Sequence, residues 1–126
     1  MHVASPVVLQ EAIRHEDEII RPALQGTLSV MRACQATKVR RVSITSSIAA
    51  IICNNPESQP VVFDETIWSD ADYGRIGVYE KSKTLAELAA WDFVANLPEQ
   101  ERFELTAINP SVIIGPSLIK TNFVSG

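Results

Sequence analysis

Residues 79–110 read YEKSKTLAELAAWDFVANLPEQERFELTAINP, and this stretch decides the fold class. Residues 79–97 are dominated by Ala, Leu, Glu and Lys and are followed directly by Pro98, which predicts a helix over that range. Apolar side chains then alternate with other residues over 102–109, which predicts a strand that Pro110 stops. A long helix that leads into a strand is the repeating unit of α/β proteins.

The upstream sequence repeats this alternation of helix and strand. Apolar residues recur every three or four positions over 17–38, which predicts a helix with one buried stripe and with Pro22 in its first turn or at a kink. Residues 39–45 alternate like an inner strand, and the apolar run 48–53 fits the buried end of that strand and the loop after it. Residues 1–4 are apolar and fit the stub of a further strand.

The predicted order is therefore strand, helix, strand, helix, strand, and such alternation requires a parallel sheet with right-handed crossovers. We predict that residues 1–126 form one partial α/β domain, the second half of a doubly wound sheet. The mixed segment 59–78 before the second helix predicts a loop with one short helical turn, and long loops in compact domains are often functional.

Composition limits the class of protein. The chain has 126 residues, 46% of them hydrophobic and 21% charged, which is typical of one folded domain. Its formal net charge of −4, with basic residues grouped only at Lys38, Arg40 and Arg41, argues against a nucleic-acid or anionic membrane partner. Cys34 and Cys53 lack the spacing of a metal site or a disulfide framework, so we predict two buried thiols in a reducing compartment and no metal.

The sequence also lacks recognisable targeting signals. No basic segment followed by an apolar core opens it, and no apolar run approaches the ~18 residues needed to span a bilayer. We therefore expect a cytoplasmic protein without a membrane partner.

The first turn of the helix 79–97 and a serine pair upstream indicate a site. On a helical wheel Tyr79 and Lys83 fall on the same side as the apolar residues of the helix, and burying a lysine has a free-energy cost that calls for a reason. The two side chains are one turn apart, about 6 Å along the axis, and an ammonium near a phenol favours the phenolate. Ser46 or Ser47, at the end of the preceding strand, can hydrogen-bond a substrate oxygen at the strand edge where ligands of such sheets bind.

Each signal also has a purely structural explanation. Lys83 can extend into solvent from the first turn of the helix, where the stripe is near the surface. A serine pair after a strand is often a plain turn, and a tyrosine four residues before a lysine often arises by chance. The three signals occur together, in order and on the predicted elements, and this combination favours an active site.

Several blocks of the sequence form a recognisable set, comprising His2–Pro6, Ile20–Thr27, Arg41–Ser47, Asp64–Glu65, Trp68–Asp70, Tyr79–Trp91, Asn109–Pro110 and Gly115–Pro116. In this order they resemble the extended short-chain dehydrogenase/reductases of the NAD-dependent epimerase/dehydratase superfamily, in the branch of dihydroflavonol 4-reductase and cinnamoyl-CoA reductase. The resemblance covers almost the whole chain.

The resemblance implies a Rossmann fold, an NADP cofactor rather than NAD, and hydride transfer between NADPH and a small-molecule carbonyl compound. It implies that Ser47 is the catalytic serine, that Tyr79 donates the proton, and that Lys83 binds the nicotinamide ribose and favours the ionised tyrosine. The resemblance also implies the remaining cofactor contacts. Val3, Ala4 and Ser5 match the turn beside the cofactor phosphates, and Pro110 and Ile113 match the segment beside the nicotinamide.

The sequence departs from this family where the cofactor and the substrate are selected. It contains no G-x-G-x-x-G turn, and the family's substrate region extends beyond Gly126. Ile52 stands where dihydroflavonol reductases carry a polar residue, and residues 74–78 lack the Asn-Trp-Tyr motif of cinnamoyl-CoA reductases, so neither plant substrate is supported. We expect a central fragment that is inactive and self-associates when isolated.

Two alternatives remain open. A nucleotide-sugar epimerase or dehydratase of the same fold shares the Ser, Tyr and Lys, although residues 64–70 and 83–87 favour the reductase. The other alternative is a non-catalytic truncated chain, acting as an interaction module or without a role. Its sheet would have an open apolar edge, and the pyrophosphate of the cofactor would lose its main anchor.

Overall fold

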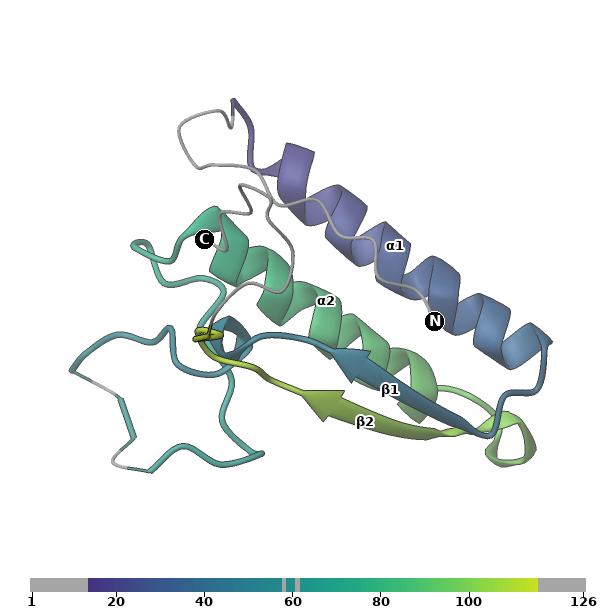
Figure 1. The fold of residues 1–126 in the computed structure, drawn as a ribbon. Coiled ribbons are helices and arrows are strands. Elements are labelled where there is room, and N and C mark those ends of the chain that lie inside the picture. Colours follow the sequence, from purple (N-terminus) through teal and green to yellow (C-terminus); the bar gives the residue numbers. More distant parts are fainter. Residues whose placement is uncertain (1–13, 58, 61, 116–126) are drawn as a thin grey trace.

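A computed structural model describes residues 14–57, 59–60 and 62–115 of the chain (Figure 1). The predicted strand at residues 1–4, with Val3, Ala4 and Ser5, lies outside these ranges. The described elements are, in order, α1 (Asp17–Ala36), β1 (Arg41–Thr45), the 3-10 helix η2 (Ile48–Ala50), α2 (Val78–Ala95), the 3-10 helix η3 (Glu99–Glu101) and β2 (Glu104–Ile108). The two long helices and the two strands predicted within these ranges are confirmed, with no end shifted by more than two residues.

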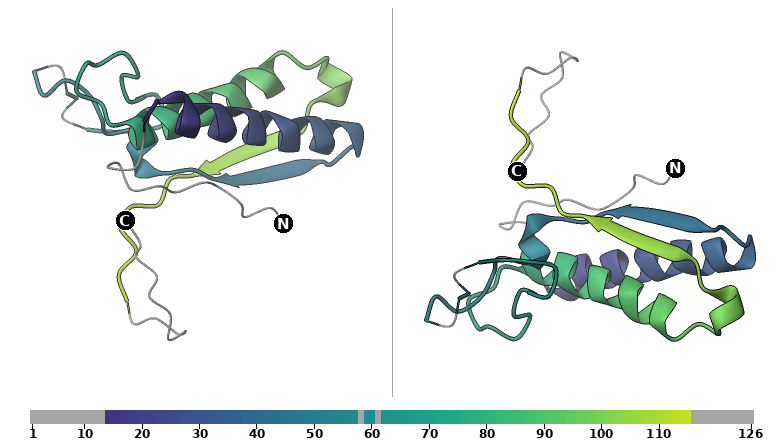
Figure 2. Two further views of the ribbon diagram at one scale, coloured as in Figure 1. Left: turned by 90° about the horizontal axis from the view of Figure 1, so that it is seen from above. Right: turned by 90° about the horizontal axis from the view of Figure 1, so that it is seen from below.

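Within the described residues, β1 and β2 form a parallel sheet, paired from Arg41 with Glu104 to Thr45 with Ile108. Both views in Figure 2 show α1 and α2 side by side on one face of this sheet. Parallel neighbours need a crossover connection, and α2 provides it between β1 and β2. The predicted α/β class and the partial doubly wound sheet are thus confirmed.

The core lies between the sheet and the two helices. Met31 of α1, Ala90 of α2, Leu97 and Phe103 are buried together, and the exposed fractions of Met31 and Ala90 are 1% and 0%. Partly buried side chains from both strands and both helices pack against them, namely Cys34, Val42, Ile44, Phe93, Val94 and Leu105. Because successive strand residues point to opposite faces, each strand has one set of side chains against this core and one set exposed.

α1 buries less of its apolar stripe than the sequence predicts. The predicted stripe comprises Ile20, Leu24, Leu28, Met31 and Cys34 or Gln35. Of these Met31 is buried as expected, and the others are only partly covered; Ile19, which the stripe did not include, is buried as well. Pro22 lies inside the helix. Cys34 and Cys53 are free thiols, and both are partly rather than fully buried, which corrects the prediction of two buried thiols.

The apolar run after β1 is not the strand end that the sequence predicts. Ile48–Ala50 form η2, and Ser47 is its N-cap, with its Oγ accepting a hydrogen bond from the Ala49 N–H at 3.2 Å. A serine oxygen that satisfies an otherwise unpaired N–H favours the start of a helical turn. The short helix turns the chain away from the sheet directly after Ser47.

α2 is buried on more than one side, which also differs from the prediction of a single apolar stripe. Ala90 is buried as expected, but so are the polar residues Ser82, Thr84 and Glu87, whereas Tyr79 is 38% exposed. The reason is that α2 contacts α1, η2 and β2. Burial on this helix therefore follows its neighbours rather than its apolar pattern.

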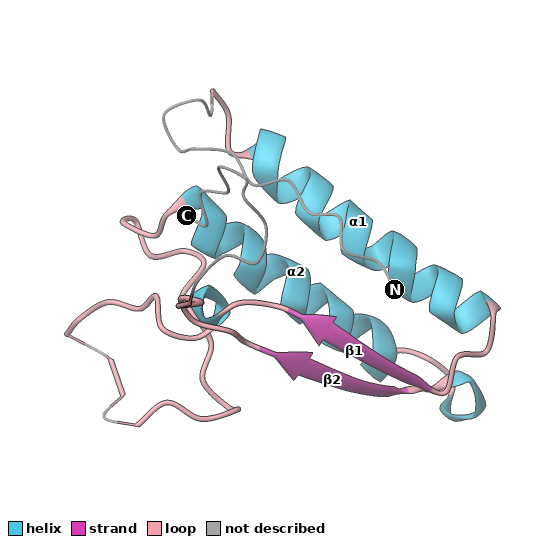
Figure 3. Cartoon of the chain, in the orientation of Figure 1, coloured by secondary structure: helices cyan, strands magenta, loops and turns pink. Residues whose placement is uncertain are grey.

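The segment between η2 and α2 is a long loop in Figure 3. Its described residues contain turns but no helix, so the short helical turn predicted within 59–78 is not found in them. Asp64 accepts hydrogen bonds from the hydroxyl (2.6 Å) and the N–H (2.9 Å) of Thr66, and these bonds lower the pKa of the Asp64 carboxyl. Local hydrogen bonds of this kind shape the loop without secondary structure.

Candidate active site

The carboxyl ends of β1 and β2 remain paired beyond the strands themselves. The N–H of Ser46 donates to the carbonyl of Ile108 at 2.8 Å, and the N–H of Ile48 donates to the carbonyl of Pro110 at 3.0 Å. These two bonds place Ser47 beside Pro110, at the edge of the sheet where ligands of open α/β sheets bind. Two of the residues predicted to form the site are thus adjacent.

Ser47 is held in a defined orientation. It is 9% exposed, its backbone is extended, and its Oγ accepts the hydrogen bond from Ala49 that caps η2. A hydroxyl group that accepts one hydrogen bond keeps its own O–H to donate. The geometry therefore suits a serine that donates a hydrogen bond to a substrate oxygen.

Tyr79 and Lys83 lie in the first turns of α2, one turn apart. The Lys83 Nζ lies 5.3 Å from the centroid of the Tyr79 ring, within the range of a cation–π contact. Lys83 is partly buried, and this burial lowers the pKa of its ammonium group. The contact places a positive charge next to the Tyr79 ring.

The serine and the tyrosine–lysine pair come from elements that touch. η2 begins directly after Ser47 and contacts α2, the helix that carries Tyr79 and Lys83. Within the residues it describes, the structure does not bring the remaining predicted cofactor contacts into this site. Ile113 is 81% exposed, and Val3, Ala4 and Ser5 lie outside the described residues.

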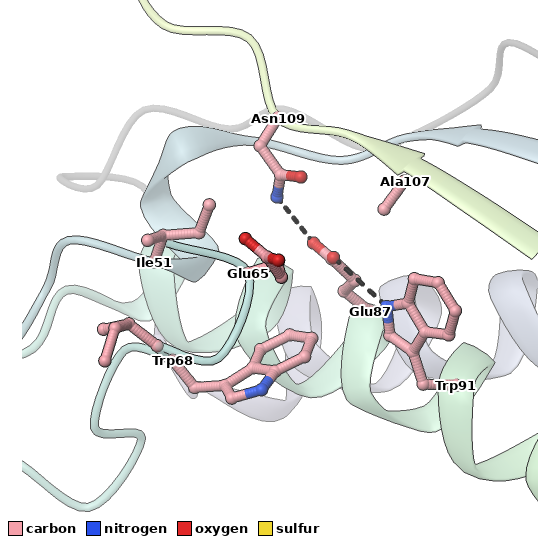
Figure 4. A pocket seen from close by; sticks show the side chains of 8 residues that line it. Ile51, Glu65, Trp68, Glu87, Trp91, Ala107 and Asn109 are labelled. Carbon is pink, nitrogen blue, oxygen red and sulfur yellow. Dashed lines mark hydrogen bonds between the residues drawn. The ribbon is translucent and has the colours of Figure 1, made fainter. Parts of the chain in front are cut away.

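Three further residues form a network that the sequence interpretation missed. The Asn109 Nδ2 donates to the carbonyl of Ser47 at 3.0 Å and to the Oε2 of Glu87 at 2.7 Å. The Trp91 Nε1 donates to the Oε1 of Glu87 at 3.3 Å, and Figure 4 shows the Glu87 carboxylate between the two donors. Their positions in the sequence could have indicated this network. Glu87 follows Tyr79 by eight residues on the same helix, and Asn109 directly precedes Pro110, so both lie near residues predicted for the site.

A cavity of ≈ 340 Å³ lies next to this network. Figure 4 shows side chains from the loop, α2 and β2 around it, and its lining consists of Ile51, Glu65, Ile67, Trp68, Glu87, Trp91, Ala107 and Asn109. Tyr79 and Lys83 do not line it, whereas Glu87 and Asn109 of the network do.

Ser69 attaches the long loop to the segment that follows Ser47. Its Oγ donates to the carbonyl of Ala49 at 2.7 Å and accepts from the N–H of Cys53 at 2.8 Å, and Ser69 is 4% exposed. Burial, followed by the charge of Glu80, raises the pKa of the Cys53 thiol, and the bond to Ser69 opposes this shift. Cys53 is therefore a poor nucleophile.

We expect Ser69→Ala to lower the free energy of unfolding by about 1–3 kcal/mol, because it removes the partner of a buried carbonyl and of a partly buried N–H. Urea unfolding measures the difference. Ser29→Ala is the matched control, since the Ser29 Oγ donates to the Gln25 carbonyl on an exposed face of α1. The control should change stability by less than about 0.5 kcal/mol, and equal effects of the two variants would contradict the anchoring role.

Two features are absent from the described ranges. No group of three or more His, Cys, Asp or Glu side chains there could hold a metal ion. None of the helices in the same ranges is long and apolar enough to cross a membrane.

Comparison with known proteins identifies the family. Residues 1–124 match the 3-beta hydroxysteroid dehydrogenase/isomerase family. The chain belongs to this family. The resemblance to the branch of dihydroflavonol 4-reductase and cinnamoyl-CoA reductase is also confirmed. A cinnamoyl-CoA reductase and a dihydroflavonol 4-reductase are both among the relatives of the chain.

The chain is 42% identical over 121 residues to cinnamoyl-CoA reductase CAD2 of Medicago truncatula, covering 93% of the chain and 36% of that protein. It is 40% identical over 120 residues to tetraketide alpha-pyrone reductase 1 of Arabidopsis thaliana, with 93% and 35% coverage. Among solved structures, the yeast methylglyoxal/isovaleraldehyde reductase Gre2 complexed with NADPH matches with a TM-score of 0.76 and 30% identity, over 92% of the chain and 36% of that structure. The 126-residue chain thus spans little more than a third of the length of these relatives.

Proposed function

We propose that this chain carries the serine, tyrosine and lysine of an NADPH-dependent reductase that acts on a ketone or aldehyde. The observation that carries the proposal is the half-buried Lys83 ammonium, 5.3 Å from the Tyr79 ring, on the helix that contacts the turn after Ser47. The relatives named above are reductases, and the yeast relative was solved with NADPH. These relatives support a reductase, and they do not identify its carbonyl substrate.

The residues fit the nicotinamide end of such a cofactor. Lys83 supplies a cation for the ribose hydroxyl groups, and Pro110 lies beside Ser47 at the strand edge. Val3, Ala4, Ser5 and Ile113 are the other proposed contacts. When bound, NADPH supplies the hydride that forms the new C–H bond at the carbonyl carbon.

The side chains of this chain account for the proton. The Ser47 hydroxyl donates a hydrogen bond to the carbonyl oxygen and orients it. As the C=O double bond becomes a single bond, the Tyr79 hydroxyl transfers its proton to that oxygen and completes the alcohol. The Lys83 ammonium stabilises the tyrosinate that remains, and the 38% exposure of Tyr79 lets solvent return the proton.

A substrate screen tests the proposal on the complete gene product that carries these residues. NADPH oxidation is followed with a panel of ketones, aldehydes and nucleotide sugars, and NADH is compared as the alternative donor. We expect at least one carbonyl compound to consume NADPH, and to do so faster than NADH. Turnover of a nucleotide sugar while every ketone and aldehyde fails would replace the reductase by an epimerase or dehydratase.

The isolated 126-residue chain should bind NADPH weakly and self-associate. In the described residues β1 pairs with β2 alone, so within those residues the outer edge of each strand is unpaired, and open edges favour pairing between chains. Sedimentation velocity measures the association, and fluorescence titration measures the NADPH affinity. A monomer with micromolar affinity for NADPH would contradict this expectation.

A further inference from the structure

We propose that Glu87, acting through Asn109, is a positioning residue that sets the place of Ser47 relative to the helix of Tyr79 and Lys83. This inference rests on the proposed function, because it concerns how the same site is aligned. Glu87 itself does not touch the reacting atoms. Its role is to connect α2 to the strand edge where Ser47 lies.

The Asn109 amide is the centre of the connection. Its NH₂ group has two hydrogens, and its Nδ2 donates hydrogen bonds to the Ser47 carbonyl at 3.0 Å and to the Glu87 Oε2 at 2.7 Å. Asn109 directly follows β2, Ser47 lies just beyond β1, and Glu87 belongs to α2. A single side chain therefore joins the three elements that build the site.

Glu87 is well suited to hold that amide. It is 6% exposed, and a carboxyl group that is buried to this degree is costly unless it is hydrogen-bonded. Both of its oxygens accept a hydrogen bond, one from Asn109 and one from Trp91. Tyr79, Lys83 and Glu87 follow each other at intervals of four residues, so neighbouring members of the series are side by side on the helix surface.

The connection reaches the peptide bond of Ser47 itself. The Ser47 carbonyl accepts from Asn109, and the N–H on the other side of that peptide bond, on Ile48, donates to the Pro110 carbonyl. A shift of the Asn109 amide therefore moves the backbone from which the Ser47 hydroxyl extends. Misplacement of a catalytic group by about 1 Å can lower a rate by about 100-fold.

Glu87→Gln in the complete gene product tests this role. The glutamine amide keeps one acceptor oxygen but places an NH₂ group against one of two donors, Asn109 Nδ2 or Trp91 Nε1. We expect kcat to fall about tenfold or more while KM for NADPH changes little, because alignment and not cofactor binding is lost. Asp92→Asn is the matched control, since it removes the same charge from an exposed position on α2 and should leave kcat unchanged.

A second readout does not depend on activity. Amide hydrogen exchange by NMR reports the bond from the Ile48 N–H to the Pro110 carbonyl and the cap from the Ala49 N–H to the Ser47 Oγ. We expect both amides to exchange faster in Glu87→Gln and at the wild-type rate in Asp92→Asn. If the wild-type protein reduces no carbonyl compound, the proposed function fails, and this exchange measurement alone then decides whether Glu87 positions Ser47.

Three results would overturn the inference. The first is amide exchange at Ile48 and Ala49 that stays at the wild-type rate in Glu87→Gln. The second, in a protein that reduces a carbonyl compound, is faster exchange in Glu87→Gln together with an unchanged kcat. If Glu87→Gln does not fold, Trp91→Phe replaces it, because Trp91 is 36% exposed and the change removes one of the two bonds to Glu87. Wild-type exchange at both amides in Trp91→Phe is the third such result, and faster exchange supports the inference.

Discussion

Tyr79→Phe should lower kcat for carbonyl reduction by about 10²–10⁴-fold in the complete gene product, which is the usual contribution of a general acid. The change removes only the hydroxyl that donates the proton. The remaining phenyl ring can still contact the Lys83 ammonium, so the affinity for NADPH should change little. Because Tyr79 is 38% exposed, loss of the hydroxyl should alter the free energy of unfolding by less than about 0.5 kcal/mol.

Tyr73→Phe is the matched control for this experiment. Tyr73 is the other tyrosine of the chain, lies in the loop before α2 and loses the same hydroxyl group. Steady-state kinetics, thermal melting and NADPH titration on the three proteins separate chemistry from folding and binding. Equal activity in Tyr79→Phe and the wild type would rule out Tyr79 as the proton donor.

Lys83→Ala should lower both the affinity for NADPH and kcat. The ammonium is assigned two tasks, to hydrogen-bond the ribose and to stabilise the tyrosinate. Loss of a hydrogen bond to a charged group corresponds to roughly 10- to 100-fold in affinity. Lys81→Ala is the control, because Lys81 lies on the same helix and instead forms an ion pair with Glu16, with Nζ and Oε2 3.1 Å apart. Equal losses in the two lysine variants would show that general charge, and not the place of Lys83, supports the reaction.

The burial of Lys83 adds a measurement of stability against pH. Burial lowers the pKa of Lys83 in the folded chain, so between this lowered value and the ordinary lysine value the unfolded chain binds the proton more strongly. The contribution of Lys83 to the free energy of unfolding therefore rises as the pH increases through that window. Lys83→Ala should flatten this rise, and Lys81→Ala should leave it in place.

Much of the fold is visible in local sequence patterns. The composition of residues 79–97 with Pro98 after them, and the alternation over 39–45 and 102–109, predicted elements whose ends lie within two residues of those observed. These signals are local, because helix and strand periodicities are set by neighbouring residues. The alternation of helix and strand then limited the topology to a parallel sheet, which the pairing of β1 with β2 confirms.

The candidate site was only partly accessible from the same patterns. The spacing of Tyr79 and Lys83 within one helical turn predicted that they meet, and the contact is observed. The sequence also predicted Ser47 at the end of a strand, but it did not predict that the Ser47 Oγ caps a 3-10 helix. That cap depends on how the chain turns away from the sheet, which the apolar run 48–53 does not encode by periodicity.

By itself, the sequence determined the order of the elements and the tyrosine–lysine pair, because both arise from residues close together in the chain. Only the tertiary structure decided that the polar residues of α2 are buried, since α1, η2 and β2 surround that helix. It alone also joined Asn109 to Ser47 and Glu87, which are 62 and 22 residues away. Such contacts form when distant segments fold against one another, and no local pattern of hydrophobic residues specifies them.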